Sequence, residues 1–229
     1  MFWKIPKMWE GGECWIIGGG PSIPQQFEVP EDVIKGVQSK ELPMSAYSPF
    51  LSPIHGKHTI GINVAFMLGT WIDVMFFGDS GFYKTNRHEL AAFPKLKVTC
   101  AAGLDGRCEA GGVKLVRKSR RHDYGITEEK DSVSWGNNSG AASISLAVRL
   151  GVKKIYLLGF DMNIGNGTQH FHSQYGAKSQ PGIDRVFTRH LRCFPAIEAD
   201  AKRMGIEIIN VSPNSTIKAF PRVSLKEVL

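Results

Sequence analysis

The sequence has few cysteines and no long apolar run. Four of its 229 residues are cysteine (Cys14, Cys100, Cys108 and Cys193), and no two form a CxxC pair. Cys100 and Cys108 could bracket a zinc loop, but no other ligands stand at the spacing that such a site needs, so reduced thiols in a cytoplasmic protein are expected. Because no stretch approaches about 18 apolar residues, neither a signal peptide nor a membrane span is expected.

The common hydrolase signatures are absent as well. The chain has no GxSxG, HExxH or paired CxxC motif, so hydrolytic triads and zinc folds have no support. Its content of 42% hydrophobic and 21% charged residues is ordinary for a chain that folds around a core. The length fits one domain that needs no disulfide or metal to fold. A formal charge of +7 indicates an anionic partner without saying which.

Short apolar runs alternate with helical patterns along the chain. Strands are expected at 14–18, 58–63, 73–78, 95–100, 113–116, 154–159 and 207–211, and amphipathic helices between 135 and 154 and at 195–204. This alternation predicts a Rossmann-like, doubly wound α/β fold with a mainly parallel sheet and helices on both faces, as a single domain over 1–229. Segments 36–57 and 164–182 are expected as long loops or lids, and 100–130 as a basic insertion.

Small and polar residues follow five of the expected strands. They are Gly18, Gly19, Gly20, Pro21 and Ser22 after the first strand, Asn63 after the second, Asp79 after the third, Asp161 after the strand at 154, and Ser212, Asn214 and Ser215 after the last. Ligands of open α/β sheets bind outside the carboxyl ends of the strands. The pattern therefore predicts one composite binding site.

The glycines at the first strand end suit close approach of the backbone to a phosphate, at the start of a helix. The motif Gly-Gly-Gly-Pro-Ser is neither GxGxxG nor a P-loop, which weakens the corresponding dinucleotide and P-loop hypotheses. A glycine-rich turn without any ligand remains the alternative. Asp161 is suited to a ribose hydroxyl or a metal, with a cap or turn carboxylate as the alternative.

Histidines supply the candidate acid–base groups. In extended backbone His170 and His172 face the same side, where they suit a metal site together with Asp161 or a proton shuttle, or else lie on the surface. His190, beside two arginines, suits a general base or an anion site. Tyr175, in the same glycine-rich loop as the histidine pair, suits donation to a leaving phosphate.

A basic cluster accounts for most of the net charge. Its members are Lys114, Arg117, Lys118, Arg120 and Arg121, and without them 23 Lys and Arg would face 21 Asp and Glu, a charge of +2. The cluster suits contact with an acceptor, a nucleotide or nucleic acid, and a solvated basic loop is the alternative. Trp135 and Trp71 suit base stacking or core packing.

Four motifs together resemble a known superfamily. They are Gly18–Ser22, Asn63, the run from Asn138-Ser-Gly-Ala to Leu150-Gly-Val-Lys-Lys-Ile-Tyr-Leu-Leu-Gly-Phe-Asp161, and Val211-Ser-Pro-Asn-Ser215. They are similar to those of the bacterial sialyltransferases of glycosyltransferase family forty-two and of the MptE-like 6-hydroxymethyldihydropterin pyrophosphokinases. That superfamily also includes flagellin glycosylation factors and phage proteins. The similarity spans about residues 14–220, with gaps at 36–57 and 100–130.

The resemblance implies roles for individual residues. Gly19, Gly20, Pro21 and Ser22 would bind nucleotide phosphate or sugar, and Asn63 the nucleotide or donor. Ser139 and Gly140 would lie against the nucleotide, with Asp161 near its ribose and Ser212, Asn214 and Ser215 approaching the donor. His190 lies about two positions from the place of the sialyltransferase base.

The chain also departs from both branches of the superfamily. Gly19 stands where sialyltransferases have Asn, and of the loop tyrosines only Tyr175 is present. His170-Phe-His172 is closer to the His-x-His of the pyrophosphokinases, whose neighbouring acidic residues are missing.

Three hypotheses follow. The first is a glycosyltransferase that uses a nucleotide-activated sugar, with His190 or His172 deprotonating an acceptor hydroxyl. The second is a pyrophosphokinase that uses ATP and Mg²⁺ on a pterin-like alcohol. The third is a nucleotide-binding or nucleic-acid-binding module without catalysis. The sequence leaves the donor, the acceptor, the use of a metal and the oligomeric state open.

Overall fold

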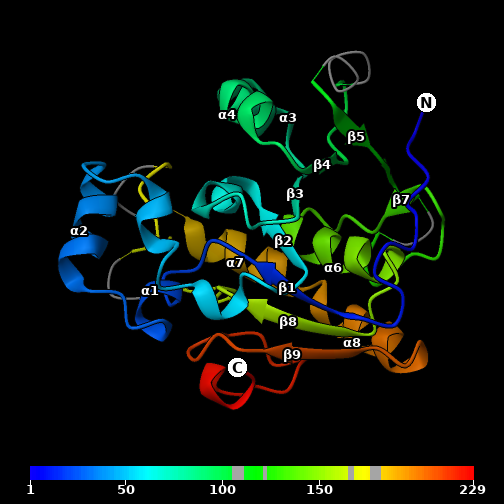
Figure 1. The fold of residues 1–229 in the computed structure, drawn as a ribbon. Helices are drawn as coiled ribbons and strands as arrows, with labels where there is room; N and C mark the ends of the chain where they lie inside the picture. The colour runs from blue at the N-terminus through cyan, green and yellow to red at the C-terminus, as the bar shows by residue number, and fades with distance from the viewer. Residues whose placement is uncertain (105–110, 121–122, 165–167, 176–181) are drawn as a thin grey trace.

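The computed structural model describes residues 1–104, 111–120, 123–164, 168–175 and 182–229. At its centre lies a seven-stranded sheet in which every neighbouring pair is parallel (Figure 1). Its strands are β1 (Glu13–Ile17), β2 (Thr59–Ile62), β3 (Val74–Phe77), β4 (Leu96–Thr99), β5 (Val113–Leu115), β8 (Lys154–Leu158) and β9 (Glu207–Asn210). Their order is β5-β4-β3-β2-β1-β8-β9. The predicted Rossmann-like α/β fold is confirmed.

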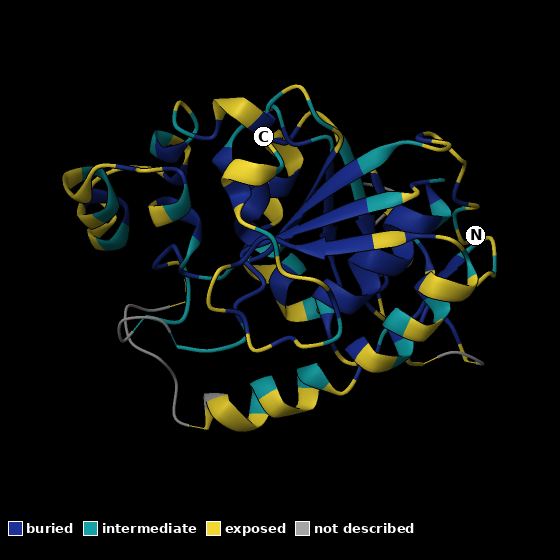
Figure 2. Ribbon diagram, turned by 90° about the horizontal axis from the view of Figure 1, so that it is seen from below, coloured by how far each residue is buried: buried dark blue, intermediate teal, exposed yellow. Residues whose placement is uncertain are grey.

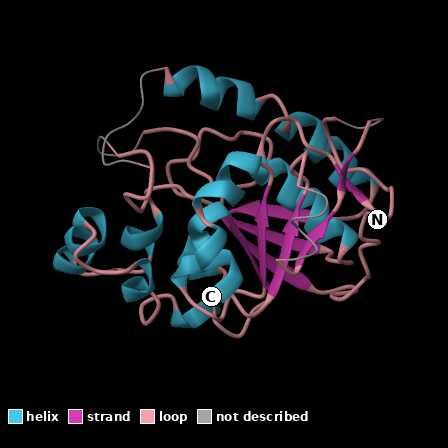
Figure 3. Cartoon of the chain, turned by 90° about the horizontal axis from the view of Figure 1, so that it is seen from above, coloured by secondary structure: helices cyan, strands magenta, loops and turns pink. Residues whose placement is uncertain are grey.

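Alternating side chains of the strands divide the core into two layers. In β1, Cys14 and Ile16 pack on one face, together with α6 (Ser139–Arg149) and α8 (Phe194–Arg203). Trp15 and Ile17 pack on the opposite face, against α1 (Ile23–Gln26) and the segments that follow it. Figure 2 shows the strands buried along most of their length, and Figure 3 shows helices on both sides of the sheet. Burial on both faces explains why these strands read as continuous apolar runs.

Helix α6 is buried over nearly its whole length, and β8 follows it after a short turn. Asn138 caps its first turn, and Gly151 follows it with φ of +101°. The expected helix between 135 and 154 is therefore confirmed. Helix α8 begins with Phe194 and Pro195, and a proline in the first turn lacks only an N–H that would be unpaired there anyway.

The remaining elements are short. They are α2 (Glu31–Ser39), α3 (Ser80–Thr85), α4 (Arg87–Ala92), α7 (Ile183–Leu191), the 3₁₀ turns η1 (Met44–Tyr47), η2 (Ser52–Ile54), η3 (Asn63–Leu68) and η4 (Leu225–Glu227), and a separate two-stranded sheet of β6 (Arg117–Lys118) and β7 (Ser132–Val133). Helix α7 is drawn without dark blue in Figure 2, because none of its described side chains is fully buried.

The segment expected as a loop at 36–57 contains the end of α2 and both η1 and η2. Met44, Tyr47, Leu51 and Ile54 from this segment are buried in the second core layer. The Tyr47 hydroxyl donates to the carbonyl of Phe171 (3.1 Å), which lies in the other expected loop. These contacts join the two segments into one packed wall beside the sheet. Parts of the expected 164–182 loop and 100–130 insertion fall outside the described residues.

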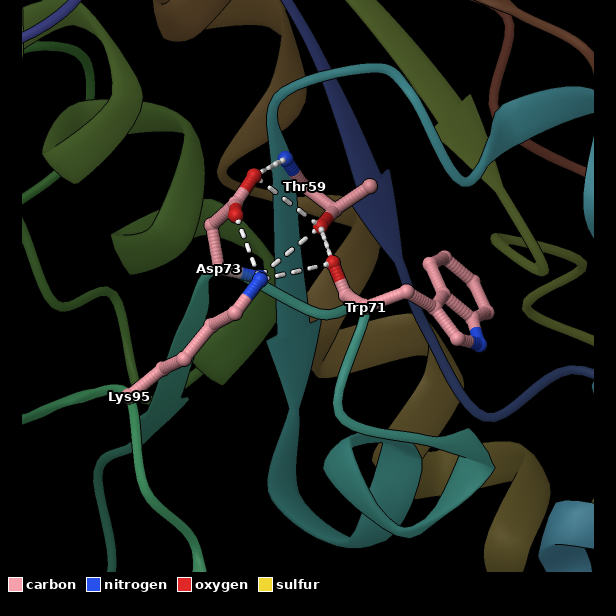
Figure 4. A network of polar contacts seen from close by, with 4 residues as sticks. All are labelled: Thr59, Trp71, Asp73 and Lys95. Atoms are coloured by element: carbon pink, nitrogen blue, oxygen red, sulfur yellow. Dashed lines mark hydrogen bonds and ion pairs between the residues drawn. The ribbon is translucent and has the colours of Figure 1, made fainter.

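A polar network fixes the amino ends of β2 and β3 (Figure 4). The Asp73 carboxylate accepts from the N–H of Thr59 (3.1 Å) and from the Lys95 ammonium (2.9 Å). The Thr59 hydroxyl lies 3.0 Å from the N–H of Asp73 and 3.3 Å from the carbonyl of Trp71. Because this network anchors the amino ends, the carboxyl ends of the two strands are held in fixed register at the opposite edge of the sheet.

Within the described ranges, no helix is both long enough and apolar enough to cross a lipid bilayer.

Candidate functional site

The sheet changes its direction of winding between β1 and β8. From β1 the chain proceeds through β2, β3 and β4 to β5 on one side, and it returns to place β8 and β9 on the other. Crevices for ligands form at such a switch point, outside the carboxyl ends of the strands. A cavity of about 440 Å³ lies there, and we call it the main cavity. It is lined by Gly18, Gly19, Gly20, Ile62, Asn63, Asp79, Trp135, Asn137, Asn138, Ser139, Gly140, Gly159, Phe160, Asp161, Met162, Asn163, Gln169, His170, Val186, Phe187, Arg189 and His190.

The glycine turn after β1 lies directly against the turn after β8. The N–H of Gly20 donates to the carbonyl of Gly159 (2.9 Å), and a Cβ added to Gly18 or Gly20 would lie 2.6 Å from that oxygen. Gly159 itself has φ of +69°, a conformation that favours glycine. Three of the glycines are therefore required for the packing of the two turns, whether or not a ligand binds.

Asp161 lies in the turn after β8 and contacts the glycine turn through Ser22, and only 3% of the residue is exposed. Its carboxylate accepts from the Ser22 hydroxyl (3.1 Å), and its backbone carbonyl accepts from the N–H of Thr216 (2.9 Å). Burial raises the pKa of Asp161, while the hydrogen bonds from Ser22 act in the opposite direction. Asp161 is thus a structural turn carboxylate that also lines the main cavity.

The N-terminus of α6 opens into the main cavity. The side-chain oxygen of Asn138 accepts from the N–H groups of Gly140 (2.8 Å) and Ala141 (3.3 Å). In the part of the chain that the structure describes, neither the N–H nor the hydroxyl of Ser139 has a partner. The cavity therefore receives two donors at the positive end of an 11-residue helix, an arrangement that favours an anion.

His190 lies against the start of α6. Its imidazole lies near the backbone of Asn137, which acts to raise the pKa, and its carbonyl accepts from the Asn138 side chain (3.3 Å). Burial, and secondarily the neighbouring Arg189 charge, lower the pKa of His190 from its usual value of 6.5. The ring is therefore mostly neutral at pH 7, so that its unprotonated nitrogen can accept a proton.

His170 and His172 lie with their rings stacked, 5.0 Å apart and 3° from parallel. Nδ1 of His170 is 3.2 Å from the carbonyl oxygen of Gly19, and His170 lines the main cavity. His172 does not, since it is 2% exposed and its Nδ1 accepts from the N–H of Gln174. Burial lowers the pKa of His172 to about 3. Tyr175 packs edge-on against both imidazoles and lines neither cavity described here.

Two other residues at strand ends reach the main cavity. Asn63, at the end of β2, has φ of +52°, and Asp79 caps α3 by accepting from the N–H of Gly81 (2.6 Å). Both were expected in the composite site, and the structure places both on its wall.

The residues after β9 divide into two groups. The Ser212 hydroxyl accepts from the N–H of Phe160 (2.8 Å), and the Ser215 hydroxyl donates to the carbonyl of Phe160 (2.6 Å). Neither serine lines the main cavity, because both hold the turn after β8 in place. Asn214 lies on a second cavity of about 270 Å³, together with Pro21, Ser22, Asp161 and Asn163.

Asp161, His170 and His172, which were expected as metal ligands, form hydrogen bonds within the protein instead. The Asp161 carboxylate accepts from Ser22, and the Nδ1 atoms of His170 and His172 are used on backbone groups. Among the described residues no three His, Cys, Asp or Glu side chains are grouped closely enough to hold a metal ion. Cys100 is buried, and Cys108 lies outside the described residues.

The described members of the basic cluster have different surroundings. Arg117 pairs with Asp131, while the Lys118 ammonium lies 4.0 Å from the centre of the Trp135 ring. Lys114 and Arg120 are exposed, and Arg121 lies outside the described residues. Because Trp135 lines the main cavity, Lys118 brings one charge of the cluster close to the rim.

Several lining residues were not expected from the sequence as site residues. Asn138 was expected only as part of a motif and Trp135 only as a stacking or core residue, while Asn137 was not singled out as a site residue. Trp71 stacks on His55 and does not line the main cavity. Two consecutive asparagines before a helix were the signal that could have pointed to its N-terminus as part of the site. Phe187 and Gln169 carried no signal, and Arg189 carried one only as a neighbour of His190, because their place in the cavity depends on long-range packing.

Comparisons with known proteins give a similarity of fold. No protein-family model matches the chain, and no curated protein matches it in sequence. The MAf glycosyltransferase from Magnetospirillum magneticum AMB-1 superposes with a TM-score of 0.56 at 14% identity, over 100% of this chain and 36% of that one. The chain thus spans about a third of that enzyme. The sialyltransferase CstII from Campylobacter jejuni with cytidine-5'-monophosphate gives a TM-score of 0.47 at 16% identity, over 93% and 84%. The fold is therefore one that a glycosyltransferase also has.

Proposed function

We propose that this chain is a glycosyltransferase that moves a sugar from a nucleotide-activated donor to a hydroxyl group of an acceptor. The observation that carries the proposal is that a neutral histidine, His190, and the N-terminus of α6 line the same cavity at the switch point of the sheet. The fold shared with the MAf glycosyltransferase supports it.

The donor would bind with its phosphate at the start of α6. The N–H and hydroxyl of Ser139 supply two hydrogen bonds, and the helix dipole supplies a partial positive charge. Arg189 lies on the same cavity wall and adds a full charge. Asp161, beside the glycine turn, is suited to accept from a ribose hydroxyl, as acidic residues do in other Rossmann-like folds.

His190 would act as the general base. Its free ring nitrogen takes the proton of the acceptor hydroxyl while the acceptor oxygen bonds to the anomeric carbon of the sugar. The bond between that carbon and the phosphate oxygen breaks, and the electron pair leaves with the nucleotide. The negative charge that develops on the phosphate is stabilised by the α6 N-terminus and Arg189, which are in place before the reaction.

The test is release of free nucleotide from CMP-, UDP- and GDP-sugars with a panel of sugar acceptors. His190→Gln keeps a side-chain N–H but removes the basic nitrogen, so we expect kcat to fall by about 10²–10⁴-fold with little change in nucleotide affinity. His88→Gln, on the exposed surface of α4, is the matched control and should leave kcat unchanged. Full activity of His190→Gln, or no turnover of any donor by the natural chain, would contradict the proposal.

A further inference from the structure

The second cavity adjoins the main cavity across a shared wall. Asp161 and Asn163 line both, and the second cavity extends from them toward α1 on one side and the loop after β9 on the other. Its volume of about 270 Å³ is smaller than the 440 Å³ of the main cavity. The two cavities are therefore neighbours on either side of Asp161 and Asn163.

The two cavities differ sharply in their chemistry. The main cavity holds His170, His190, Arg189 and the α6 N-terminus, which are the groups that bind phosphate or move a proton. The described residues of the second cavity include no cation and no histidine, and Asp161 is their only ionisable group. Phosphate is therefore favoured in the main cavity, and an uncharged part of the ligand is favoured in the second.

A chain of hydrogen bonds shapes the shared wall. The Gln26 amide donates to the Ser22 hydroxyl (3.2 Å), which donates to the Asp161 carboxylate (3.1 Å). The Asn163 amide donates to the carbonyls of Asp161 (3.1 Å) and Asn214 (2.5 Å). These side chains are engaged with one another, so they hold the wall rather than bind the ligand's distal end.

Two carboxamides remain available in the second cavity. Gln25 projects from α1 and Asn214 from the loop after β9, and among the described residues neither side chain has a hydrogen-bond partner. Each carboxamide offers a donor and an acceptor side by side, which matches the adjacent donor and acceptor atoms on the edge of a nucleobase. The rings of Pro21 and Pro213 add apolar surface that suits the face of a planar ring.

We infer that the second cavity binds the nucleobase of the donor, and that Gln25 and Asn214 determine which base is accepted. The inference rests on the proposed function, because the ribose and phosphate must lie at the shared wall and in the main cavity. Phosphate at the α6 N-terminus, ribose at Asp161 and base between Gln25 and Asn214 follow one another in the order in which they are linked in a nucleotide.

The test is calorimetric titration of CMP, UMP, AMP, GMP and ribose 5-phosphate into the natural chain and into Gln25→Leu, Asn214→Leu and the double variant. We expect the natural chain to prefer one base, and the double variant to lose roughly tenfold or more in affinity for that nucleotide. Affinity for ribose 5-phosphate, which has no base, should not change. Gln174→Leu, an exposed carboxamide on neither cavity, is the matched control.

The outcomes separate this inference from the proposed function. Nucleotide binding with equal affinity for all four bases, or a base ranking that the double variant keeps, overturns the inference and leaves the proposed function standing. An unchanged ranking with a raised KM for the acceptor would make the second cavity an acceptor site and also overturn it. Failure of every nucleotide and of ribose 5-phosphate to bind would contradict the proposed function itself.

Discussion

Gly20 shows how tightly the glycine turn is packed. A Cβ at this position would overlap the Asp161 carboxylate and lie 2.6 Å from the carbonyl oxygen of Gly159, which is backbone and cannot move freely. We therefore expect Gly20→Ala to lower the free energy of unfolding by about 3 kcal/mol, as other overpacked sites do. Urea denaturation of the two proteins measures this difference.

Gly56→Ala provides the control for that experiment. A Cβ at Gly56 meets nothing within 4 Å, and its φ is not positive, so the substitution should change the free energy of unfolding little. Equal stability of the Gly20 and Gly56 variants would show that the turn is looser than described.

His172 makes the stability of the protein depend on pH. Its pKa is about 3 in the folded protein and near 6.5 in the unfolded chain, so the unfolded chain takes up a proton first as the pH falls. Stability is thus lost between about pH 6.5 and 3, by about 2 kcal/mol at pH 5. His172→Asn keeps an acceptor for the N–H of Gln174 but does not titrate. The loss of stability from pH 7.5 to 5 should be about 2 kcal/mol smaller in this variant. An equal loss in both proteins would contradict the assignment.

His190 sets the pH dependence expected of catalysis. Because burial and Arg189 lower its pKa below 6.5, the base is already deprotonated at neutral pH. We expect kcat/KM to be flat above pH 7 and to fall on the acid side with an inflection below 6.5. A profile whose inflection lies above 7 would indicate a different base.

Asn138 links the stability of α6 to the geometry of the site. Its oxygen caps the helix and its amide nitrogen donates to the carbonyl of His190. Asn138→Ala removes both contacts and should cost about 1–2 kcal/mol of stability. Asn138→Asp keeps the cap, so its stability should stay close to that of the natural chain, while the loss of the donor to His190 lowers kcat.

Chemical denaturation and steady-state kinetics on the two Asn138 variants separate these effects. If Asn138→Asp kept full kcat, the hydrogen bond to His190 would have no role in positioning the base. An alanine variant as stable as the natural chain would show that the cap is unimportant.

The central strands and their helices were predictable because local patterns determine them. Apolar runs such as those ending at Gly18, Gly78 and Gly159 are long enough to be recognised, and each ends in the structure within a residue or two of its expected limit. Helices α3 and α4 have six residues each, too few for an apolar period. The strands β6 and β7 have two residues each and depend on pairing between distant segments.

The site could be predicted only where it follows directly from strand ends. Gly18–Gly20, Asn63, Asp79 and Asp161 reach the main cavity because parallel strands bring their carboxyl ends to one edge of the sheet. The use of Ser212 and Ser215 on the Phe160 backbone depends on side-chain packing that no local pattern shows. The contact between His190 and Asn138 likewise depends on the position of α7.

In the proposed function, the sheet, the two cavities and the α6 N-terminus together form a nucleotide site at the switch point. Ser139 tests this because it stands at the first position of α6. An aspartate there is favourable for the helix, since its negative charge faces the positive end of the dipole. The same charge would repel a bound phosphate. Stability and nucleotide affinity should therefore change in opposite directions.

The most direct measurement is calorimetric titration of CMP, UMP, AMP and GMP into the natural chain, Ser139→Asp and the uncharged control Ser139→Asn. We expect at least one nucleotide to bind the natural chain at one site, and Ser139→Asp to lose this binding while it unfolds at an equal or higher Tm. Ser139→Asn should retain most of the affinity. Binding that Ser139→Asp leaves unchanged, or no binding of any nucleotide at millimolar concentration, would contradict the account.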